Sequence, residues 1–479
     1  MNAQPDNAQK VAPGVPLVQE LVPAPDPVDV CHRLRELPYC IFLDSALRDP
    51  RLGRYSFVAA DPFAYCEVRA DGSDALATLA RRMQPLWAPT VEGLPPFQGG
   101  AAGLLAYDLN RSLERVPAAQ CDEFQVPALA VGIYDVVVAF DHLCRRAWVV
   151  SQGLPELDAG RRLRRAAQRL DEVLGWLAGR TPAARPAAER PPLARSQLAA
   201  QYPVADDPEL TSNFTARGYC DMIHRGIEYI RAGDVFQVNL AQRLLYPARH
   251  DPWTLYLRLR ARNPATFAGY FDLGDFQLVS ASPERFLAVR GGQVETRPIK
   301  GTCQRYGNPE ADLYAAGGLC ASEKDRAENV MIVDLLRNDL ARVCRPESLR
   351  VTDLCRLEVY QYVQHLVSVV VGTLMPGRTP LDAVRAAFPG GSITGAPKVR
   401  AMEIIQELEP NARGAYCGSL GYLGFDGTLD LSILIRTITA GRGWWQMPVG
   451  GGIVAQSVPA HEYAETWHKA VGLLRALRD

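Results

Sequence analysis

The chain has 479 residues, 48% of them hydrophobic and 22% charged, which is the composition of a globular protein with a large core. Its 52 Lys and Arg balance 53 Asp and Glu, which excludes a general electrostatic attraction to nucleic acid or to a membrane surface. Because no signal-peptide pattern and no apolar run of membrane-spanning length occurs, we expect a cytoplasmic protein.

The predicted elements divide the chain into two lobes. Residues 1–27 are polar and rich in proline, which favours a flexible N-terminus. Strand-like and helical segments alternate over residues 28–178, the predicted N-terminal α/β lobe. Residues 179–210 are rich in Pro, Ala and Arg and have no periodic apolar face, which is typical of a linker. Residues 211–479 form the second predicted lobe.

A hairpin is predicted in the second lobe, where strands 286–290 and 293–299 meet at Gly291-Gly292. It brings Glu284 and Lys300 together, either as a surface pair of small energetic value or as an acid beside a lysine nucleophile. A two-residue loop with regular register would send the two side chains to opposite faces. The functional interpretation therefore predicts a longer loop or a bulge between them.

Two predicted helices, 322–340 and 459–477, each carry an acidic pair at a spacing that shares one face. The pairs are Asp325 with Glu328, and Glu462 with Glu465. Taken alone, each pair is typical of a solvated helix face. Taken together, four carboxylates from two helices would suit Mg²⁺, which prefers oxygen ligands.

Three further segments indicate a cationic, glycine-lined pocket. A predicted strand places Gln237 and Asn239 on one face, where they either meet solvent or line a cavity. The loop 390–395 precedes a helix but lacks the lysine of a triphosphate-binding loop, so a carboxylate is the better guest. Arg436 lies in an apolar strand, 431–440, where its charge needs a partner. A small substrate with more than one carboxylate fits this combination.

Six segments together resemble the chorismate-utilising synthases. They are SPERF (282–286), RPIKGT (297–302), KDRAENVMIVDLLRNDL (324–340), FPGGSITGAPK (388–398), LSILIRT (431–437) and GGIVAQS (451–457). The resemblance extends over roughly residues 234–469 and is looser in the N-terminal lobe.

The resemblance implies a two-lobed α/β protein built on a large antiparallel β-sandwich flanked by helices. It also implies chorismate as the substrate and Mg²⁺ as the cofactor. The implied metal ligands are Glu328 and Glu465, with Glu462 and Asp325 beside them. The residues implied to bind the substrate are Gln237, Thr302, His365, Thr394, Tyr416, Arg436, Gly451, Gly452 and Lys469.

The family divides at Lys300. Anthranilate synthases resemble PIAGT there, whereas this chain reads PIKGT, the pattern of the members that aminate carbon 4 of chorismate. The resemblance implies that Lys300 attacks carbon 2 as a neutral amine while Glu284 protonates the leaving C4 hydroxyl. Gln237 stands where isochorismate and salicylate synthases carry a lysine that activates water. An anthranilate synthase large subunit remains the alternative.

Ammonia and tryptophan are the two remaining expected partners. No GxCxG motif marks a glutaminase cysteine, so we expect a separate glutamine amidotransferase subunit to supply ammonia. The segment FLDSA (42–46) stands where anthranilate synthases bind feedback tryptophan, but it departs from their LLES-like pattern. Whether tryptophan binds is therefore left open by the sequence.

Overall fold

The computed structural model describes residues 15–180, 190–204, 207–305, 308–359 and 363–478. Their strands form two antiparallel sheets of 13 and 10 strands. The first sheet runs in the order β1 (Leu17–Leu21), β8 (Arg146–Ser151), β7 (Val136–Asp141), β3 (Tyr55–Ala59), β2 (Ile41–Asp44), β12 (Phe267–Asp272), β13 (Phe276–Ser282), β22 (Thr437–Gly441), β23 (Trp444–Ile453), β11 (Gln237–Pro247), β10 (Asp207–Ser212) and β9 (Tyr202–Val204), with β19 (Gly395–Ala396) paired to β11.

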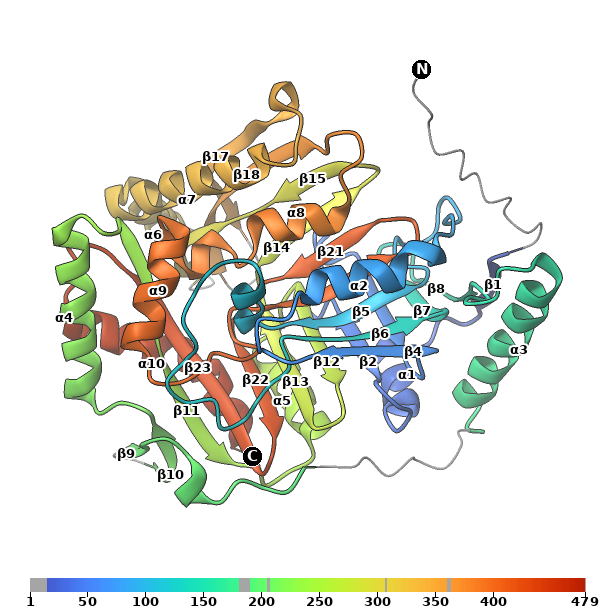
Figure 1. Ribbon diagram of the computed structural model, residues 1–479, viewed down its shortest axis with the longest axis horizontal. Coiled ribbons are helices and arrows are strands. Elements are labelled where there is room, and N and C mark those ends of the chain that lie inside the picture. The colour runs from blue at the N-terminus through green and yellow to red at the C-terminus, as the bar shows by residue number, and fades with distance from the viewer. Residues whose placement is uncertain (1–14, 181–189, 205–206, 306–307, 360–362, 479) are drawn as a thin grey trace.

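The second sheet contains the predicted hairpin and lies against the first (Figure 1). Its order is β16 (Ile299–Gln304), β18 (Val363–Thr373), β15 (Gln293–Thr296), β14 (Arg285–Arg290), β21 (Leu429–Ser432), β20 (Ser419–Gly424), β5 (Gly100–Leu105), β6 (Leu129–Tyr134) and β4 (Ala64–Val68), with β17 (Arg350–Val359) paired to β18.

Apolar side chains from facing strands fill the space between the sheets. The ring of Phe57 on β3 lies 5.6 Å from that of Tyr422 on β20, and both rings contact Phe97. All three side chains are nearly inaccessible to solvent, so they belong to one inter-sheet core. This packing confirms the predicted antiparallel sandwich.

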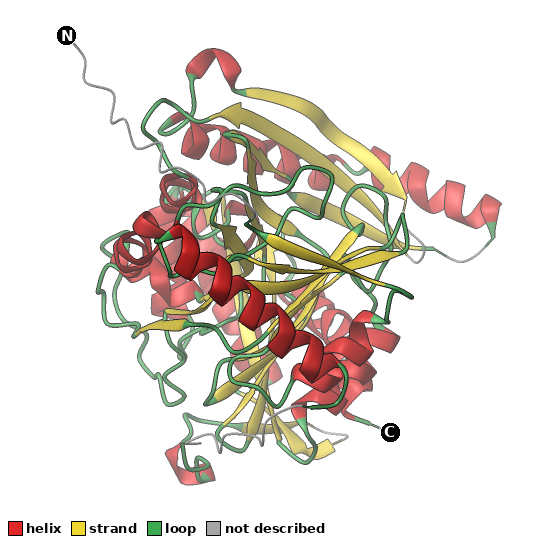
Figure 2. Ribbon diagram, turned by 90° about the vertical axis from the view of Figure 1, so that its right-hand side faces the viewer, coloured by secondary structure: helices red, strands yellow, loops and turns green. Residues whose placement is uncertain are grey.

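Helices cover the outer surfaces of the sandwich (Figure 2). They are α1 (Pro27–Leu34), α2 (Ala75–Met83), α3 (Ala159–Leu177), α4 (Ala216–Ala232), α5 (Pro252–Arg262), α6 (Pro309–Ala321), α7 (Glu323–Ala341), α8 (Pro380–Ala387), α9 (Lys398–Leu408) and α10 (Pro459–Leu477). Helix α7 packs on β16 and β18, and α10 packs on β23, so the two acidic helices border different sheets. None of the described helices is long and apolar enough to span a membrane.

Local sequence signals explain where the acidic helices begin. The Ser322 hydroxyl accepts a hydrogen bond of 3.3 Å from the Asp325 amide, which caps α7 as the sequence predicts. Helix α10 begins at Pro459, a residue that suits the first turn of a helix because it has no amide hydrogen to satisfy. Both predicted helices are confirmed to within one residue.

Three sequence-based predictions need correction or comment. The flexible N-terminus was predicted to include residues 17–21, but these form β1, which pairs with β8; residues 1–14 lie outside the described part. The predicted strand 431–440 is divided into β21 and β22, with Arg436 between them at a φ of 53°. The division of the chain into two lobes at 179–210 stays a prediction; both sheets take strands from each side of this segment, and β9 and the start of β10 lie within the predicted linker.

Candidate active site

A cavity of about 910 Å³ opens where the two sheets and the two acidic helices meet. It is of the size expected for a small-molecule site. The structure brings ten of the predicted site residues to its wall: Glu284, Lys300, Asp325, Glu328, His365, Tyr416, Arg436, Gly452, Glu465 and Lys469.

Glu284 and Lys300 face this one cavity and are connected through Ser392. The Ser392 hydroxyl donates a hydrogen bond of 3.0 Å to Glu284 Oε1, and Lys300 Nζ donates one of 3.4 Å to the Ser392 carbonyl. The Ile299 amide also donates to Glu284 Oε1, at 3.3 Å. The arrangement is therefore an acid and an amine held on one wall, as the functional interpretation of the hairpin predicts.

The hairpin achieves this geometry with a two-residue turn, so the predicted longer loop is wrong. Arg290 pairs directly with Gln293 across Gly291-Gly292, both glycines having positive φ. The irregularities lie elsewhere: the register of β14 shifts between Arg285 and Leu287 where it pairs with β21. The chain also leaves the ladder at 297–298, between β15 and β16, where a proline cannot donate a ladder hydrogen bond. The pairing of β14 with β15 itself shows no register shift, so the irregularities lie in the pairing with β21 and in the break at 297–298.

The raised pKa of the Glu284 carboxyl suits this residue to act as an acid. Burial raises the pKa of the Glu284 carboxyl to about 7, although the hydrogen bonds from Ser392 and Ile299 oppose the rise. Burial and the nearby Arg436 guanidinium lower the pKa of His365 to about 4, so its imidazole is neutral near pH 7. A carboxyl group with this pKa can hold a proton at neutral pH and release it to a substrate.

Arg436 places a positive charge on the wall of the cavity. The sequence predicted a partner for this residue, but none of the described residues hydrogen-bonds or ion-pairs with its guanidinium. Burial lowers the pKa of the Arg436 guanidinium, and the neighbouring Tyr416, Glu465 and Glu284 oppose that effect. A mostly buried arginine without a partner inside a cavity is well suited to bind a carboxylate of a ligand.

Three of the four predicted metal-binding carboxylates, those of Glu328, Glu462 and Glu465, lie within 4.0 Å of a lysine. Lys300 Nζ is 3.8 Å from Glu328 Oε2, and Lys469 Nζ is 2.6 Å from Glu465 Oε1. No group of three His, Cys, Asp or Glu side chains in the described residues is arranged to hold a metal ion. The donor set nevertheless fits a hard cation in kind, because it consists of carboxylate oxygens that converge from α7 and α10.

Two glycines of β23 leave the room that these side chains occupy. A Cβ atom at Gly451 would lie 3.6 Å from both Glu462 Oε2 and Glu465 Oε1. A Cβ atom at Gly452 would lie 2.7 Å from Gln237 Nε2 and 3.5 Å from Lys300 Nζ. The predicted glycines therefore let the backbone of β23 pass close to the acidic residues and to Lys300.

Gln237 is fully buried beside Gly452, and neither polar atom of its amide has a hydrogen-bond partner among the described residues. Thr394 lies behind the cavity wall, where its hydroxyl donates to the Gly390 carbonyl at 2.9 Å. The backbone of Thr302 pairs with His365, but its side chain lies outside the described part. Because the Thr394 hydroxyl is turned to the Gly390 carbonyl, the side chain of Thr394 is not part of the cavity wall.

No sequence pattern marked Ser392 or Lys324 as part of the site, and the role of Asn239 was left open. Asn239 lines the cavity and is 5% exposed, so its predicted face meets a cavity and not bulk solvent. Its carbonyl accepts a hydrogen bond of 2.7 Å from Arg413, whose guanidinium is paired with Glu409. The sequence did not predict the Arg413–Glu409 pair as part of the site, because it is the fold that brings the pair next to Asn239.

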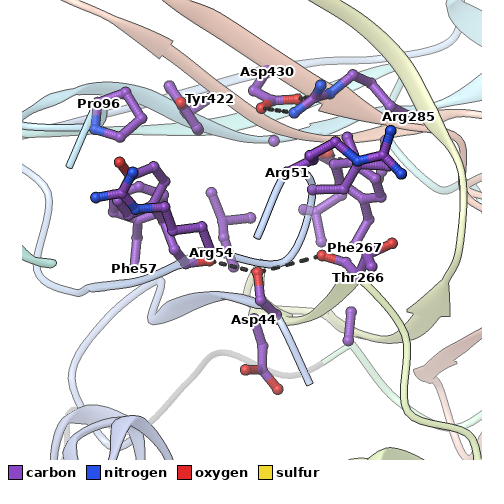
Figure 3. A pocket seen from close by; sticks show the side chains of 18 of the residues that line it. Asp44, Arg51, Arg54, Phe57, Pro96, Thr266, Phe267, Arg285, Tyr422 and Asp430 are labelled. Carbon is purple, nitrogen blue, oxygen red and sulfur yellow. Dashed lines mark hydrogen bonds and ion pairs between the residues drawn. The ribbon is translucent and has the colours of Figure 1, made fainter. Parts of the chain in front are cut away.

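A second cavity lies between β2, β12 and β20, next to the predicted FLDSA segment (Figure 3). At its upper wall Arg285 is paired with Asp430, with a shortest contact of 2.8 Å. The carboxylate of Asp44 points away from this cavity and accepts hydrogen bonds from Tyr256 at 2.8 Å and Arg260 at 2.6 Å. Thr266 lines both cavities, so one short segment separates them.

Comparisons with known proteins agree with this geometry. Residues 47–475 match the chorismate binding enzyme family. The chain is 40% identical to anthranilate synthase component 1 of Thermus thermophilus, over 94% of this chain and 95% of the relative. It is 39% identical to aminodeoxychorismate synthase component 1 of Klebsiella aerogenes, over 93% and 95%.

A solved structure supports the same assignment. Anthranilate synthase component I from Streptococcus pneumoniae superimposes with a TM-score of 0.74 at 30% identity, covering 89% of this chain and 94% of the other. The menaquinone-specific isochorismate synthase of Escherichia coli shares the fold, with a TM-score of 0.69 at 16% identity and coverage of 97% and 95%. The chain therefore belongs to the chorismate binding enzyme family.

Proposed function

We propose that the chain is component I of an aminodeoxychorismate synthase, which converts chorismate and ammonia to 4-amino-4-deoxychorismate. The observation that carries the proposal is the placement of Lys300 and Glu284 on one wall of the large cavity, joined through Ser392. An amine and a protonated carboxyl there supply the nucleophile and the acid for replacing a hydroxyl group.

The first half of the proposed reaction forms a covalent adduct. Lys300 Nζ attacks carbon 2 of chorismate, the ring double bonds shift, and the bond between carbon 4 and its hydroxyl oxygen breaks. Glu284, whose pKa is raised to about 7, gives its proton to that oxygen, which leaves as water. Protonation is needed because hydroxide is a poor leaving group.

The second half releases the lysine. Ammonia attacks carbon 4, the double bonds shift back, and the bond between carbon 2 and Lys300 Nζ breaks. One proton moves from the ammonium nitrogen to Glu284, so the enzyme returns to its starting state. The sum is chorismate plus ammonia giving 4-amino-4-deoxychorismate plus water.

The substrate's carboxylates need positive charge, which this chain supplies from several sides. Arg436 and Lys469 lie on the wall, with Tyr416 and the Gly452 backbone beside them. Glu328 and Glu465 would hold Mg²⁺, with Glu462 and Asp325 near them, and the ion would supply further positive charge for a carboxylate. His365 is a neutral neighbour on the wall that orients the ring, and Gln237 lies buried behind Gly452.

Ammonia is proposed to come from glutamine through a separate amidotransferase subunit. The names of the relatives, which call each of them component 1, are consistent with a second component. Tryptophan binding was left open by the sequence and stays open; the position of FLDSA beside the second cavity is the feature that raises it. In this proposal excess ammonium salt replaces the partner in vitro.

A second candidate is anthranilate synthase component I, which aminates carbon 2 and eliminates pyruvate. Overall identity does not separate the two candidates, because the chain is 40% identical to an anthranilate synthase component 1 and 39% identical to an aminodeoxychorismate synthase component 1. Lys300 separates the two, because amination at carbon 2 has no use for a lysine that occupies that carbon. Identification of the product formed from chorismate and ammonium distinguishes them.

A further inference from the structure

Lys324, in the first turn of α7, links the two acidic helices. Its Nζ lies 4.0 Å from Glu328 Oε1 on α7 and 3.7 Å from Glu462 Oε1 on α10. The other two lysines of the cavity pair with one of these helices each: Lys300 with α7 and Lys469 with α10. Among the described residues, Lys324 is therefore the one cation that bridges both.

The exposure of the three side chains is unequal. Glu462 is 5% exposed and Glu328 is 13% exposed, whereas Lys324 is 50% exposed. Burial raises the pKa of Glu328, and the negative charges of Asp325 and Glu462 add to the rise, while Lys300 and Lys324 oppose it. The mostly buried carboxylates of Glu328 and Glu462 repel each other. The half-exposed Lys324 between them can turn into solvent on its flexible stem.

We propose that Lys324 is a built-in counter-ion that occupies the place of a divalent cation and is displaced when that cation binds. This inference rests on the Mg²⁺ site of the proposed function. The ammonium group of Lys324 and a divalent cation held by Glu328 and Glu465 would share the Glu328 carboxylate and repel each other, so Lys324 must move outward when the ion enters. Lys324 therefore holds the helices together without the ion and weakens the affinity for it.

Glu328 Oε1 and Glu462 Oε1 lie at ion-pair distance from the Lys324 ammonium group. Glu462 Oε1 also accepts a hydrogen bond of 2.6 Å from the Ser457 hydroxyl, and Glu328 Oε2 lies 3.8 Å from Lys300 Nζ. Exchange of one cation for another needs only a side-chain rotation at the cavity mouth, because the stem of Lys324 is half-exposed. Binding and release of the metal would then proceed without separating α7 from α10.

The test measures Mn²⁺ binding to the full chain in the absence of chorismate. Binding is monitored through the electron paramagnetic resonance signal of the Mn²⁺ that stays free in solution. Mn²⁺ accepts the same oxygen ligands as Mg²⁺. Removal of the competing charge in Lys324→Gln should tighten binding by about tenfold, which is a small part of the repulsion between close charges after solvent screening. Lys324→Arg, which keeps the charge, should stay near the wild-type affinity.

A matched control removes a positive charge from the exposed side of the same helix. Arg337 lies on α7 and pairs with the exposed Asp334 at 3.1 Å. Arg337→Gln should leave Mn²⁺ affinity unchanged. An equal gain in this control, or unchanged or weaker binding in Lys324→Gln, would overturn the role of Lys324.

Failure of the cation site itself gives a different pattern. Glu328→Gln should weaken Mn²⁺ binding strongly if the ion is held at the proposed site. Wild-type protein that binds no Mn²⁺, or a Glu328→Gln variant that binds it equally well, would overturn both the site and the role of Lys324. The identity of the product is measured separately, so either result leaves the proposed amination to its own test.

Discussion

The Ser392 hydroxyl donates a hydrogen bond of 3.0 Å to the Glu284 carboxylate, so a residue 108 positions away in the chain acts directly on the proposed acid. The carbonyl of the same residue accepts from Lys300 at 3.4 Å. Because the contact to the acid uses the side chain and the contact to the amine uses the backbone, mutation can separate them.

The rate of 4-amino-4-deoxychorismate formation should fall as the pH rises through about 7. Glu284 must carry a proton to act as the acid, and its pKa is raised to about 7, so the active form is present below that pH and is lost above it. The pH profile of kcat for the wild type should show this basic limb. Glu284→Gln should lower kcat by about 10²-fold or more and abolish the limb; a limb that persists in this variant would belong to another group.

Ser392→Ala should move the basic limb to higher pH. The hydrogen bond from the hydroxyl stabilises the charged carboxylate and opposes the rise of the Glu284 pKa, so its removal raises that pKa further. The backbone contact to Lys300 is kept. A limb that stays in place or moves to lower pH would show that Ser392 does not act on the acid.

Arg436→Met should weaken chorismate binding without lowering the melting temperature. The guanidinium is mostly buried and has no ion partner among the described residues, so its replacement removes a desolvation cost while taking away the carboxylate contact. We expect a loss of affinity of about 10²-fold, the scale of a charge-assisted hydrogen bond. Calorimetric titration and thermal unfolding measure the two effects; a large drop in melting temperature with intact binding would contradict the assignment.

Gly452→Ala should raise KM for chorismate by about tenfold while leaving the protein folded. The added Cβ would lie 2.7 Å from Gln237 Nε2 and 3.5 Å from Lys300 Nζ, so these side chains must move, but the backbone at Gly452 needs no positive φ. Gly317→Ala on α6 is the control, because a Cβ there meets nothing within 4 Å. Equal kinetics in the two variants would show that Gly452 does not shape the site.

Regular elements and the site residues that lie on them could be predicted from the sequence. Helix α7 has the capping residue Ser322 and helix α10 has Pro459 in its first turn, so local signals place Glu328 and Glu465 along the two helices. The turn residues Gly291-Gly292 fixed the hairpin, but they could not show that the register shifts between Arg285 and Leu287, since that shift depends on the partner strand β21.

Contacts between distant segments could not be predicted. Ser392 lies 108 positions from Glu284, and Lys324 meets Glu462 from the opposite helix, so no local pattern connects them. Arg436 was expected to have a protein partner because charges in apolar strands usually do. Its strand instead ends before it, and the arginine is left free for a ligand.

The most direct test of the account is the identity of the product formed from chorismate, ammonium and Mg²⁺ by the wild type and by Lys300→Ala. Chromatography with mass detection should find 4-amino-4-deoxychorismate and no pyruvate with the wild type. In Lys300→Ala its rate of formation should fall by about 10²-fold or more, with thermal unfolding confirming that the variant folds. Anthranilate and pyruvate from the wild type, or an unchanged rate in the variant, would contradict the central claim.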